Sequence, residues 1–250
     1  MNATPLAFRF RSLIFLFLYL LGFLSPWERL VRGAGNDTLW LAASTLLARS
    51  GWIGLAGATI AVTAAALVCL VLGAILRVWG TAHLGSGVMS SFAMQGDQVL
   101  AAGPYRYVRN PLYLGGWLLA AGTSILMPPS GAAFFLVSYS IFVLILIFGE
   151  ERFLSARQGD GYQQYRRRVP RLLPRIVRGN FPSSARPRWL QALLAEIYPV
   201  GFTLCFAIFA WRYNARILIQ CLLICYGLSL ISRALIRRTV PLANANIDFV

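Results

Sequence analysis

Long apolar runs separated by short polar segments follow one another along most of this chain. A membrane-spanning helix needs about 20 apolar residues, because it rises about 1.5 Å per residue across roughly 30 Å of hydrocarbon. Residues 52–76 satisfy this length without a single charge, and Gly54 and Gly57 near their start should permit close helix packing. The pattern predicts an all-α, multi-spanning membrane helical bundle of about six transmembrane helices. These spans are expected at 13–24, 52–76, 111–127, 131–148, 191–211 and 217–232.

Three stretches need a more specific interpretation. The first run follows two arginines, as in a signal peptide, but Ser25-Pro26-Trp27 comes where a small-residue cleavage site would stand, so we expect an uncleaved span. The run 39–48 is too short to cross the bilayer as a helix, which predicts a re-entrant or interfacial helix. Pro128-Pro129-Ser130 joins its two flanking runs so tightly that residues 111–148 should form a helical hairpin.

The composition supports a membrane protein and excludes a disordered chain. Apolar residues make up 58% of the 250 residues, and charged residues only 12%, about half the share of a soluble domain. The net charge of +15 would suggest nucleic acid in a soluble protein, but here the arginines lie between apolar runs. With four cysteines inside apolar stretches and one histidine, neither a metal site nor a disulfide framework is expected.

The 23 basic residues are all arginine and indicate an orientation. Cytoplasmic loops of membrane proteins carry the excess of positive charge. We therefore expect a protein of the bacterial cytoplasmic (inner) membrane, with both termini and the active site on the cytoplasmic side. The arginines between 166 and 178 should bind anionic membrane lipids, and no nucleic acid is expected as a partner. In this arrangement five arginines lie outside, namely Arg29, Arg32, Arg49, Arg212 and Arg216.

The polar segment before the hairpin holds the first candidate chemistry. Gly103-Pro104 is typical of a turn, and Pro111 suits the first turn of the helix that it opens. Arg109 and Asn110 then lie at a helix N-terminus, where free N–H groups and the helix dipole favour an anionic group. Three nearby tyrosines add aromatic rings, and an interfacial belt of tyrosine and arginine is the plainer interpretation of the segment.

Glu150 and Glu151 are the second candidate, directly after the run 131–148. Two adjacent carboxylates repel each other and a helix C-terminus disfavours them, so a cationic group should hold them. Arg109, Arg152 or a positively charged ligand are the candidates, and solvated charges paired with nearby arginines are the alternative. Adjacent helical residues point about 100° apart, so only one carboxylate is expected to face a pocket.

The order of these motifs resembles a known family. The motif Gly-x-Tyr-x-x-x-Arg-x-Pro-x-Tyr from Gly103 to Tyr113 is followed by the hairpin, Glu150-Glu151, a glycine, Tyr162-x-x-Tyr165 and Val169-Pro170. This order is similar to the integral-membrane methyltransferases, which comprise the isoprenylcysteine carboxyl methyltransferases and the phospholipid N-methyltransferases. The resemblance covers residues 77–174 and leaves out the flanking spans.

The resemblance implies a cofactor, S-adenosylmethionine, in a cytoplasmic pocket under the polar loops and the segment that follows Glu151. Glu150 and Arg109 are expected to act in catalysis, with Glu150 as the base where the acceptor carries a proton. Arg77 and Trp79 resemble an Arg-x-Trp that the family shows upstream. The cofactor-binding residues implied by the resemblance are Gln98, Val99, Leu100, Gly103, Tyr105, Asn110, Pro111, Leu112, Tyr113 and Glu151.

The chemistry of the cofactor agrees with these residues. Its sulfonium cation suits carboxylates and aromatic faces, and its own carboxylate suits Arg109. Two positions depart from the family pattern. Asn110 stands where histidine is usual, and an amide cannot carry a proton. Leu146 stands where the family has an arginine that contacts a prenylcysteine substrate, which counts against methylation of a prenylated protein.

These observations predict a methyltransferase that acts on a lipid or small amphiphilic acceptor at the cytoplasmic face. The alternative is a non-catalytic membrane protein that binds anionic lipids or a partner through its arginine-rich face. A transporter is disfavoured because the spans hold almost no ionisable residue except Glu196. We expect N-terminal spans at 1–76, a methyltransferase-like core at 77–178, and an extra hairpin at 189–238 that forms a dimer face or enlarges the substrate chamber.

Overall fold

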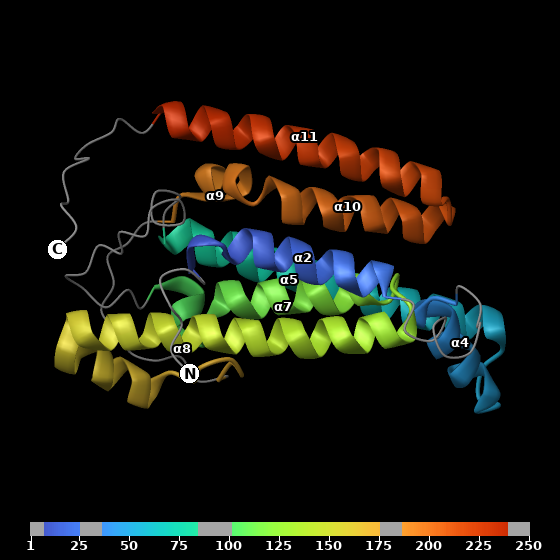
Figure 1. Cartoon of the computed structure of the whole chain (residues 1–250), viewed down its shortest axis with the longest axis horizontal. Coiled ribbons are helices and arrows are strands. Elements are labelled where there is room, and N and C mark those ends of the chain that lie inside the picture. Colours follow the sequence, from blue (N-terminus) through green and yellow to red (C-terminus); the bar gives the residue numbers. More distant parts are fainter. Residues whose placement is uncertain (1–7, 26–36, 85–101, 176–186, 240–250) are drawn as a thin grey trace.

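The computed structural model describes residues 8–25, 37–84, 102–175 and 187–239, and within these ranges the chain is helical and contains no strand. Most of the helices lie side by side along one long axis (Figure 1). The all-α architecture expected from the sequence is therefore confirmed. The elements are α2 (Arg11–Leu24), α4 (Leu39–Arg49), α5 (Leu55–Leu84), the short 3₁₀ helix η1 (Gly103–Arg106), α7 (Pro111–Ser124), α8 (Pro129–Arg168), α9 (Trp189–Ala195), α10 (Ile197–Arg212) and α11 (Ala215–Thr239).

Two of the described helices, α5 and α8, are long and apolar enough to cross a membrane, and the pair α9–α10 is a third span if its two halves count as one. The remaining apolar helices are shorter, with 14 residues in α2 and 11 in α4. The expected number of six spans stays a prediction.

The two segments that carry the candidate motifs lie on or beside α5 and α8, and both helices are longer than the sequence predicted. Helix α5 continues past Arg77 to Leu84, whereas the sequence predicted an end to the helix at Arg77. Helix α8 continues past Glu150 and Glu151 to Arg168, with a break at Gly159, where φ is 54° and ψ is −131°. The break turns the last part of α8 back along the bundle, as Figure 1 shows at its lower left.

Close contact between α5 and α7 depends on a glycine that the sequence analysis did not single out. A Cβ atom on Gly73 of α5 would lie 2.7 Å from the carbonyl oxygen of Gly115 on α7, so only glycine fits. Bare backbone at such a contact lets two helices approach closely where lipid supplies no hydrophobic drive. Among the described residues, Gly57, which we expected to serve this purpose, meets only Ile53, just before α5, and Gly54 meets nothing within 4 Å.

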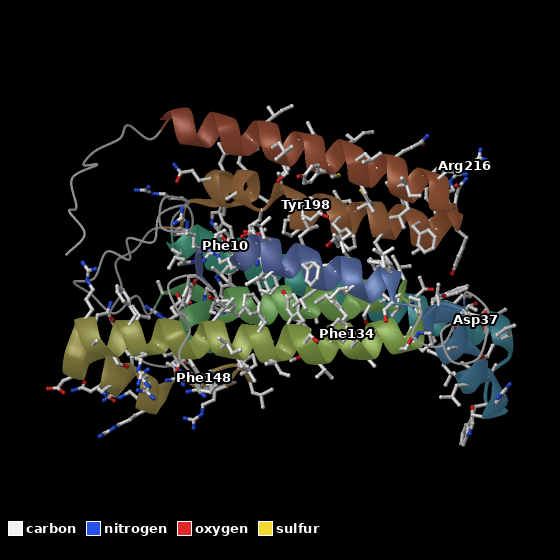
Figure 2. The ribbon with its side chains drawn as sticks, viewed as in Figure 1. Phe10, Asp37, Phe134, Phe148, Tyr198 and Arg216 are labelled. Atoms are coloured by element: carbon white, nitrogen blue, oxygen red, sulfur yellow. The ribbon has the colours of Figure 1, made fainter. Side chains whose placement is uncertain are left out.

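The two ends of the bundle differ in what they carry. At one end, α4 is tied to the turn between α7 and α8, because the amides of Leu39 and Trp40 donate to the carbonyls of Met127 (2.7 Å) and Ile125 (2.8 Å). At the other end lie η1, α9 and the turned-back part of α8 (Figure 1). In Figure 2, Asp37 marks the first end, whereas Phe148 lies toward the second. The candidate site residues belong to the second end.

The helix expected at 191–211 is broken at Glu196 into α9 and α10, which are bent by 69°. Pro199 explains the break, because it has no N–H to donate to the carbonyl of Ala195 and its ring crowds that carbonyl. Glu196 lies at the corner and is almost fully buried, with 1% of its surface exposed.

Candidate functional site

The turn that precedes α7 is shaped by a glycine. Gly103 has φ of +54°, a conformation that side-chain-bearing residues rarely adopt, and the His83 imidazole lies where its Cβ would be. The turn therefore packs directly on the end of α5. Pro104 and Tyr105 point inward and are buried, and Pro111 opens α7 as predicted.

The segment after α8 covers this turn by backbone pairing. The amide of Arg109 donates to the carbonyl of Pro170 at 2.8 Å, and the amide of Arg175 donates to the carbonyl of Tyr107 at 3.1 Å. The Tyr165 hydroxyl donates to the carbonyl of Tyr105 at 2.8 Å. Two segments that lie far apart in the sequence are thereby held as one layer, with the α8 break at Gly159 providing the reversal.

Glu151 is the centre of a buried ion cluster. Its carboxylate accepts from Arg171 Nη2 at 2.8 Å and lies 3.3 Å from Arg109 Nη2. The Asn110 amide donates to the same carboxylate at 3.4 Å and to the carbonyl of Arg171 at 3.2 Å. A carboxylate with 4% of its surface exposed has lost its hydration, and these partners replace it.

The cluster contains two guanidinium groups for one carboxylate, so it keeps positive charge. The Arg109 side chain is 8% exposed, and its Nε is buried without a hydrogen-bond partner among the described residues. An orphaned, buried guanidinium N–H is costly unless an anionic group accepts from it. Arg171 lies over the Phe148 ring at 4.5 Å, which holds its guanidinium plane in place.

Glu150 has different partners from its neighbour. The Tyr113 hydroxyl, one turn into α7, donates to the Glu150 carboxylate. The Tyr105 hydroxyl lies within electrostatic reach of Glu150, and burial, followed by that negative charge, raises the pKa of Tyr105 well above its usual value. Tyr105 is therefore a protonated hydrogen-bond donor. The two carboxylates therefore have different partners, whereas the expectation that only one of them faces a pocket stays a prediction.

A second buried ion pair joins α5 to the C-terminal helices. Arg77 donates to both carboxylate oxygens of Glu196, from Nε at 2.7 Å and from Nη2 at 3.0 Å. The Thr81 hydroxyl donates to the same carboxylate at 2.9 Å. Arg77 also approaches the carbonyl of Leu112 on α7 at 3.5 Å, so the pair contacts both the core and the extra hairpin.

The structure brings together most of the residues that the sequence singled out. Tyr105, Arg109, Asn110, Tyr113, Glu150 and Glu151 meet at one end of the bundle, with Pro111 and Leu112 in the first turn of α7. Gly103 shapes the turn rather than facing these groups. Gln98, Val99 and Leu100 lie outside the described residues.

Sequence reasoning missed two partners. Arg171 is one of many arginines after α8, and nothing in the pattern distinguishes it from its neighbours. Glu196 was noticed only as a rare charge in an apolar run, and Arg77 only as part of an Arg-x-Trp motif. An isolated acid and an isolated arginine in apolar surroundings do indicate a pair, because neither is tolerated alone in a membrane.

Comparison with known proteins identifies the segment that carries this site. The phospholipid methyltransferase family matches residues 61–160. The chain is 42% identical over 72 residues to the methanethiol S-methyltransferase of Crocosphaera subtropica. The aligned segment covers 29% of this chain and 28% of that protein. It is 35% identical over 121 residues to the protein-S-isoprenylcysteine O-methyltransferase of Schizosaccharomyces pombe. The aligned segment covers 44% of this chain and 49% of that protein.

A third relative, the methanethiol S-methyltransferase of Mycobacterium tuberculosis, is 39% identical over 70 residues, which is 28% of this chain and 28% of that protein. The chain thus spans half or less of the length of these curated relatives. No solved structure matches it.

Tyr105, Arg109, Tyr113, Glu150 and Glu151 all lie within the matched residues 61–160. Residues 61–160 are similar to the phospholipid methyltransferase family, which confirms the resemblance recognised in the sequence.

Proposed function

We propose that this protein transfers a methyl group from S-adenosylmethionine to a lipid or small amphiphilic acceptor. The observation that carries the proposal is the pairing of two unlike environments at one end of the bundle. Glu150 with Tyr113 and Tyr105 offers negative charge and aromatic faces. The Arg109 Nε, which is buried without a hydrogen-bond partner in the part of the chain that the structure describes, offers a donor to an anion.

These two environments fit the two charges of the cofactor. The Arg109 Nε would donate to the cofactor's carboxylate, and the N-terminus of α7 would support the same negative charge. The carboxylate of Glu150 and the rings of Tyr105 and Tyr113 suit the sulfonium. When bound, the cofactor supplies a methyl group on a sulfur that leaves as a neutral thioether.

The protein's own contribution is to hold the acceptor in line with that methyl group in a dry site. Where the acceptor is a thiol, Glu150 would accept its proton as the sulfur takes the methyl group, so that the carboxylate becomes neutral as the sulfonium loses its positive charge. Tyr113 donates to Glu150 and holds its orientation, and Tyr105 remains a neutral donor. An acceptor that is already a carboxylate has no proton to lose, so it needs no base. Glu150 then contributes only its negative charge.

The arginine distribution supports the placement of the site on the cytoplasmic side of a bacterial inner membrane. Arg109, Arg171 and the arginines at the end of α8 lie at the same end of the chain's fold as Glu150 and Glu151. Cytoplasmic loops carry such positive charge, and anionic headgroups attract it.

Calorimetry of the detergent-solubilised protein with S-adenosylhomocysteine tests the proposal. We expect one site with a Kd in the micromolar range, where many enzymes bind their substrates. Glu151→Gln should weaken this binding, whereas Arg157→Ala, on the exposed side of α8, should leave it unchanged. A folded protein that does not bind S-adenosylhomocysteine would contradict the proposal.

A further inference from the structure

Helix α2 lies outside the matched residues 61–160, yet it packs along α8, one of the helices that carry the candidate site. Near the start of α8, a Cβ atom on Gly131 would collide with the carbonyl of Gly22. About one turn further along α8, the ring centroids of Phe135 and Tyr19 lie 4.5 Å apart. Residue numbers fall along α2 as they rise along α8, so the two helices run in opposite directions. These contacts define the register between them.

The register places the first residue of α2 beside the candidate site. One turn beyond the previous pair on each helix, the ring centroids of Phe15 and Tyr139 lie 4.8 Å apart. A further turn of α2 brings Arg11 opposite residues 143–146 of α8. Side chains on a helix point toward its N-terminus, which for α2 is the direction of Glu150, one turn beyond those residues. The long Arg11 side chain therefore extends toward Glu150.

The electrostatics of the site agree with this placement. Arg11 lies within electrostatic reach of both Glu150 and Tyr113. Figure 2 shows Phe10 and Phe148, which are close to Arg11 and Glu150 in the sequence, toward the same end of the bundle. Arg11 is half-buried, so water and salt screen its charge less than that of an exposed arginine.

Glu150 lies just beyond the apolar run 131–148, and its charge depends on its neighbours. Burial raises the pKa of Glu150, the Tyr113 hydrogen bond and the Arg11 charge lower it, and Glu151 raises it. Arg109 and Arg171, by contrast, bind Glu151. In the part of the chain that the structure describes, Arg11 is thus the cation that most favours the ionised form of Glu150.

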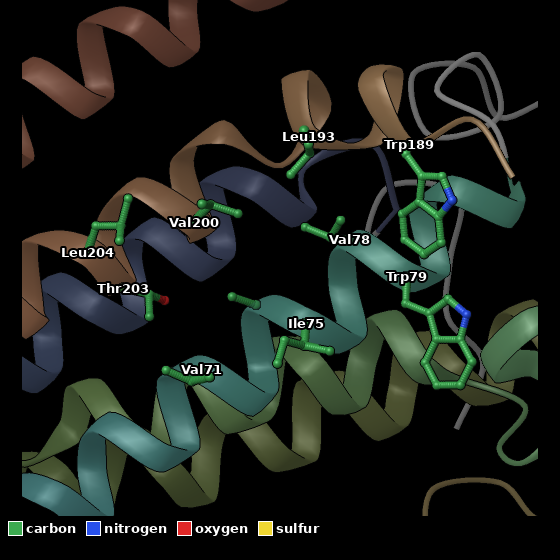
Figure 3. A pocket seen from close by; sticks show the side chains of 10 residues that line it. Val71, Ile75, Val78, Trp79, Trp189, Leu193, Val200, Thr203 and Leu204 are labelled. Carbon is green, nitrogen blue, oxygen red and sulfur yellow. The ribbon is translucent and has the colours of Figure 1, made fainter.

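The other groups around Glu150 do not replace this cation. Tyr105 of η1 and Tyr162 of the turned-back part of α8 also face Glu150, and burial raises the pKa of both, so they are neutral. The C-terminal hairpin meets α5 instead, across an apolar groove of about 520 Å³ (Figure 3), and its acid Glu196 is bound by Arg77. The charge of Glu150 therefore depends on α2 and not on the C-terminal hairpin.

We propose that Arg11 is a positioning residue of the candidate site, which acts through Glu150 by holding its carboxylate in the ionised form beside Tyr113. This inference rests on the proposed function, in which an ionised Glu150 accepts the acceptor's proton and suits the sulfonium. It also gives α2 a role, because a helix outside the family-matched residues then completes the site. Without the Arg11 charge, Glu150 should remain protonated up to a higher pH.

The chain contains no lysine, which allows this one charge to be removed after folding. Arg11→Lys keeps the positive charge, and acetylation of its single lysine side chain neutralises it. Arg9→Lys is the matched control, because Arg9 lies just before α2 but is exposed, and its acetylation removes the same charge. Infrared spectroscopy across a pH titration measures the protonation of Glu150, as the carboxylic-acid band that Glu150→Gln removes.

We expect acetylation of Arg11→Lys to move the midpoint of this band to higher pH by roughly one unit, the low end of the effect of a close opposite charge. Arg11→Lys before acetylation should titrate as the natural chain does, and so should acetylated Arg9→Lys. An unmoved midpoint, or the same shift in both acetylated variants, would overturn the inference.

Turnover separates this role from a merely structural one. With butanethiol as the acceptor, acetylated Arg11→Lys should lose roughly tenfold in kcat/KM below the natural midpoint and nothing above the shifted one, since one pH unit changes the ionised fraction tenfold. An equal loss at every pH would show a structural role and overturn the inference. S-adenosylhomocysteine has no sulfonium charge and should bind all these proteins alike. A natural chain that does not bind it would instead overturn the proposed function.

Discussion

Glu150 and Glu151 are adjacent in the sequence, yet they belong to different environments. Glu151 is held by Arg109 and Arg171 in a buried ion cluster, whereas Glu150 accepts a hydrogen bond from Tyr113. The 100° step between adjacent helical residues separates them. One carboxylate is therefore neutralised by the protein's own cations, and the other is left to a hydroxyl and to whatever binds beside it.

This division predicts different defects for two otherwise identical substitutions. Glu150→Gln should lower kcat at least tenfold and leave the fold intact, because the amide cannot accept a proton. Glu151→Gln should mainly weaken S-adenosylhomocysteine binding and stability, because two guanidinium groups lose their buried counter-ion. Turnover measurements and calorimetry on both variants check this. The same defect in both would show that the two carboxylates share one role.

Arg171 is expected to support the cofactor site from outside the family-matched segment. Arg171→Ala removes the 2.8 Å contact to Glu151 and leaves Arg109 as the sole cation on that carboxylate. Arg109 should then be drawn toward Glu151, which weakens S-adenosylhomocysteine binding roughly tenfold, the scale of one lost charge-assisted contact. Arg157→Ala, also an arginine of this region but exposed, is the control. Unchanged binding in Arg171→Ala would show that the cluster is structural only.

Tyr105 should not limit activity on the alkaline side. Burial and Glu150 raise its pKa well above the usual value of about 10, so its hydroxyl stays protonated at and beyond that pH. The natural chain should bind S-adenosylhomocysteine without loss up to about pH 10. Tyr105→Phe should weaken binding by a factor that does not depend on pH in this range. A loss of binding between pH 8 and 10 that Tyr105→Phe abolishes would contradict this.

The Arg77–Glu196 pair should dominate the attachment of the C-terminal hairpin. Glu196→Ala leaves the partly buried guanidinium of Arg77 unpaired and should lower the free energy of unfolding by about 3 kcal/mol, the low end for a broken buried ion pair. The double variant Arg77→Met with Glu196→Met should be less destabilised, because no charge remains unpaired. Unfolding in mixed detergent micelles, arranged as a double-mutant cycle, measures the coupling. Additive single effects would show that the pair contributes no coupling energy.

Gly103 and Gly159 share a positive φ but differ in their surroundings. A Cβ on Gly103 would collide with the His83 ring, whereas one on Gly159 meets nothing within 4 Å. Both substitutions to alanine add backbone strain of about 1–3 kcal/mol, but only Gly103→Ala also displaces the turn from α5. Thermal unfolding should therefore show the larger loss for Gly103→Ala. Equal losses would mean that strain alone matters.

The sequence was sufficient to predict several residues that the fold brings together, because local motifs indicate them. Pro111 opens α7, and Arg109 lies against Glu151. Each of these follows from helix geometry or from charge over a short range. The all-α architecture follows equally directly from the long apolar runs.

The long-range partners could not be predicted in the same way. Arg171 reaches Glu151 only because the break at Gly159 turns the chain back, and a single glycine in the sequence does not indicate that a helix reverses there. The division of 191–211 at Glu196 needed two facts together, Pro199 in the chain and Arg77 on a neighbouring helix. The spacing of apolar residues indicates which face of a segment is buried, but not which residues that face packs against. It therefore predicts neither the reversal at Gly159 nor the division at Glu196.

The order of synthesis gives the Arg77–Glu196 pair one further consequence. Arg77 leaves the ribosome 119 residues before its partner. At about 5–20 residues per second, roughly 6–24 seconds pass before Glu196 is made. During that time the guanidinium of Arg77 must extend to the membrane surface, since a lone charge is not tolerated among lipid tails. Helix α5 therefore reaches its final packed position late in biogenesis, after the C-terminal hairpin has been synthesised.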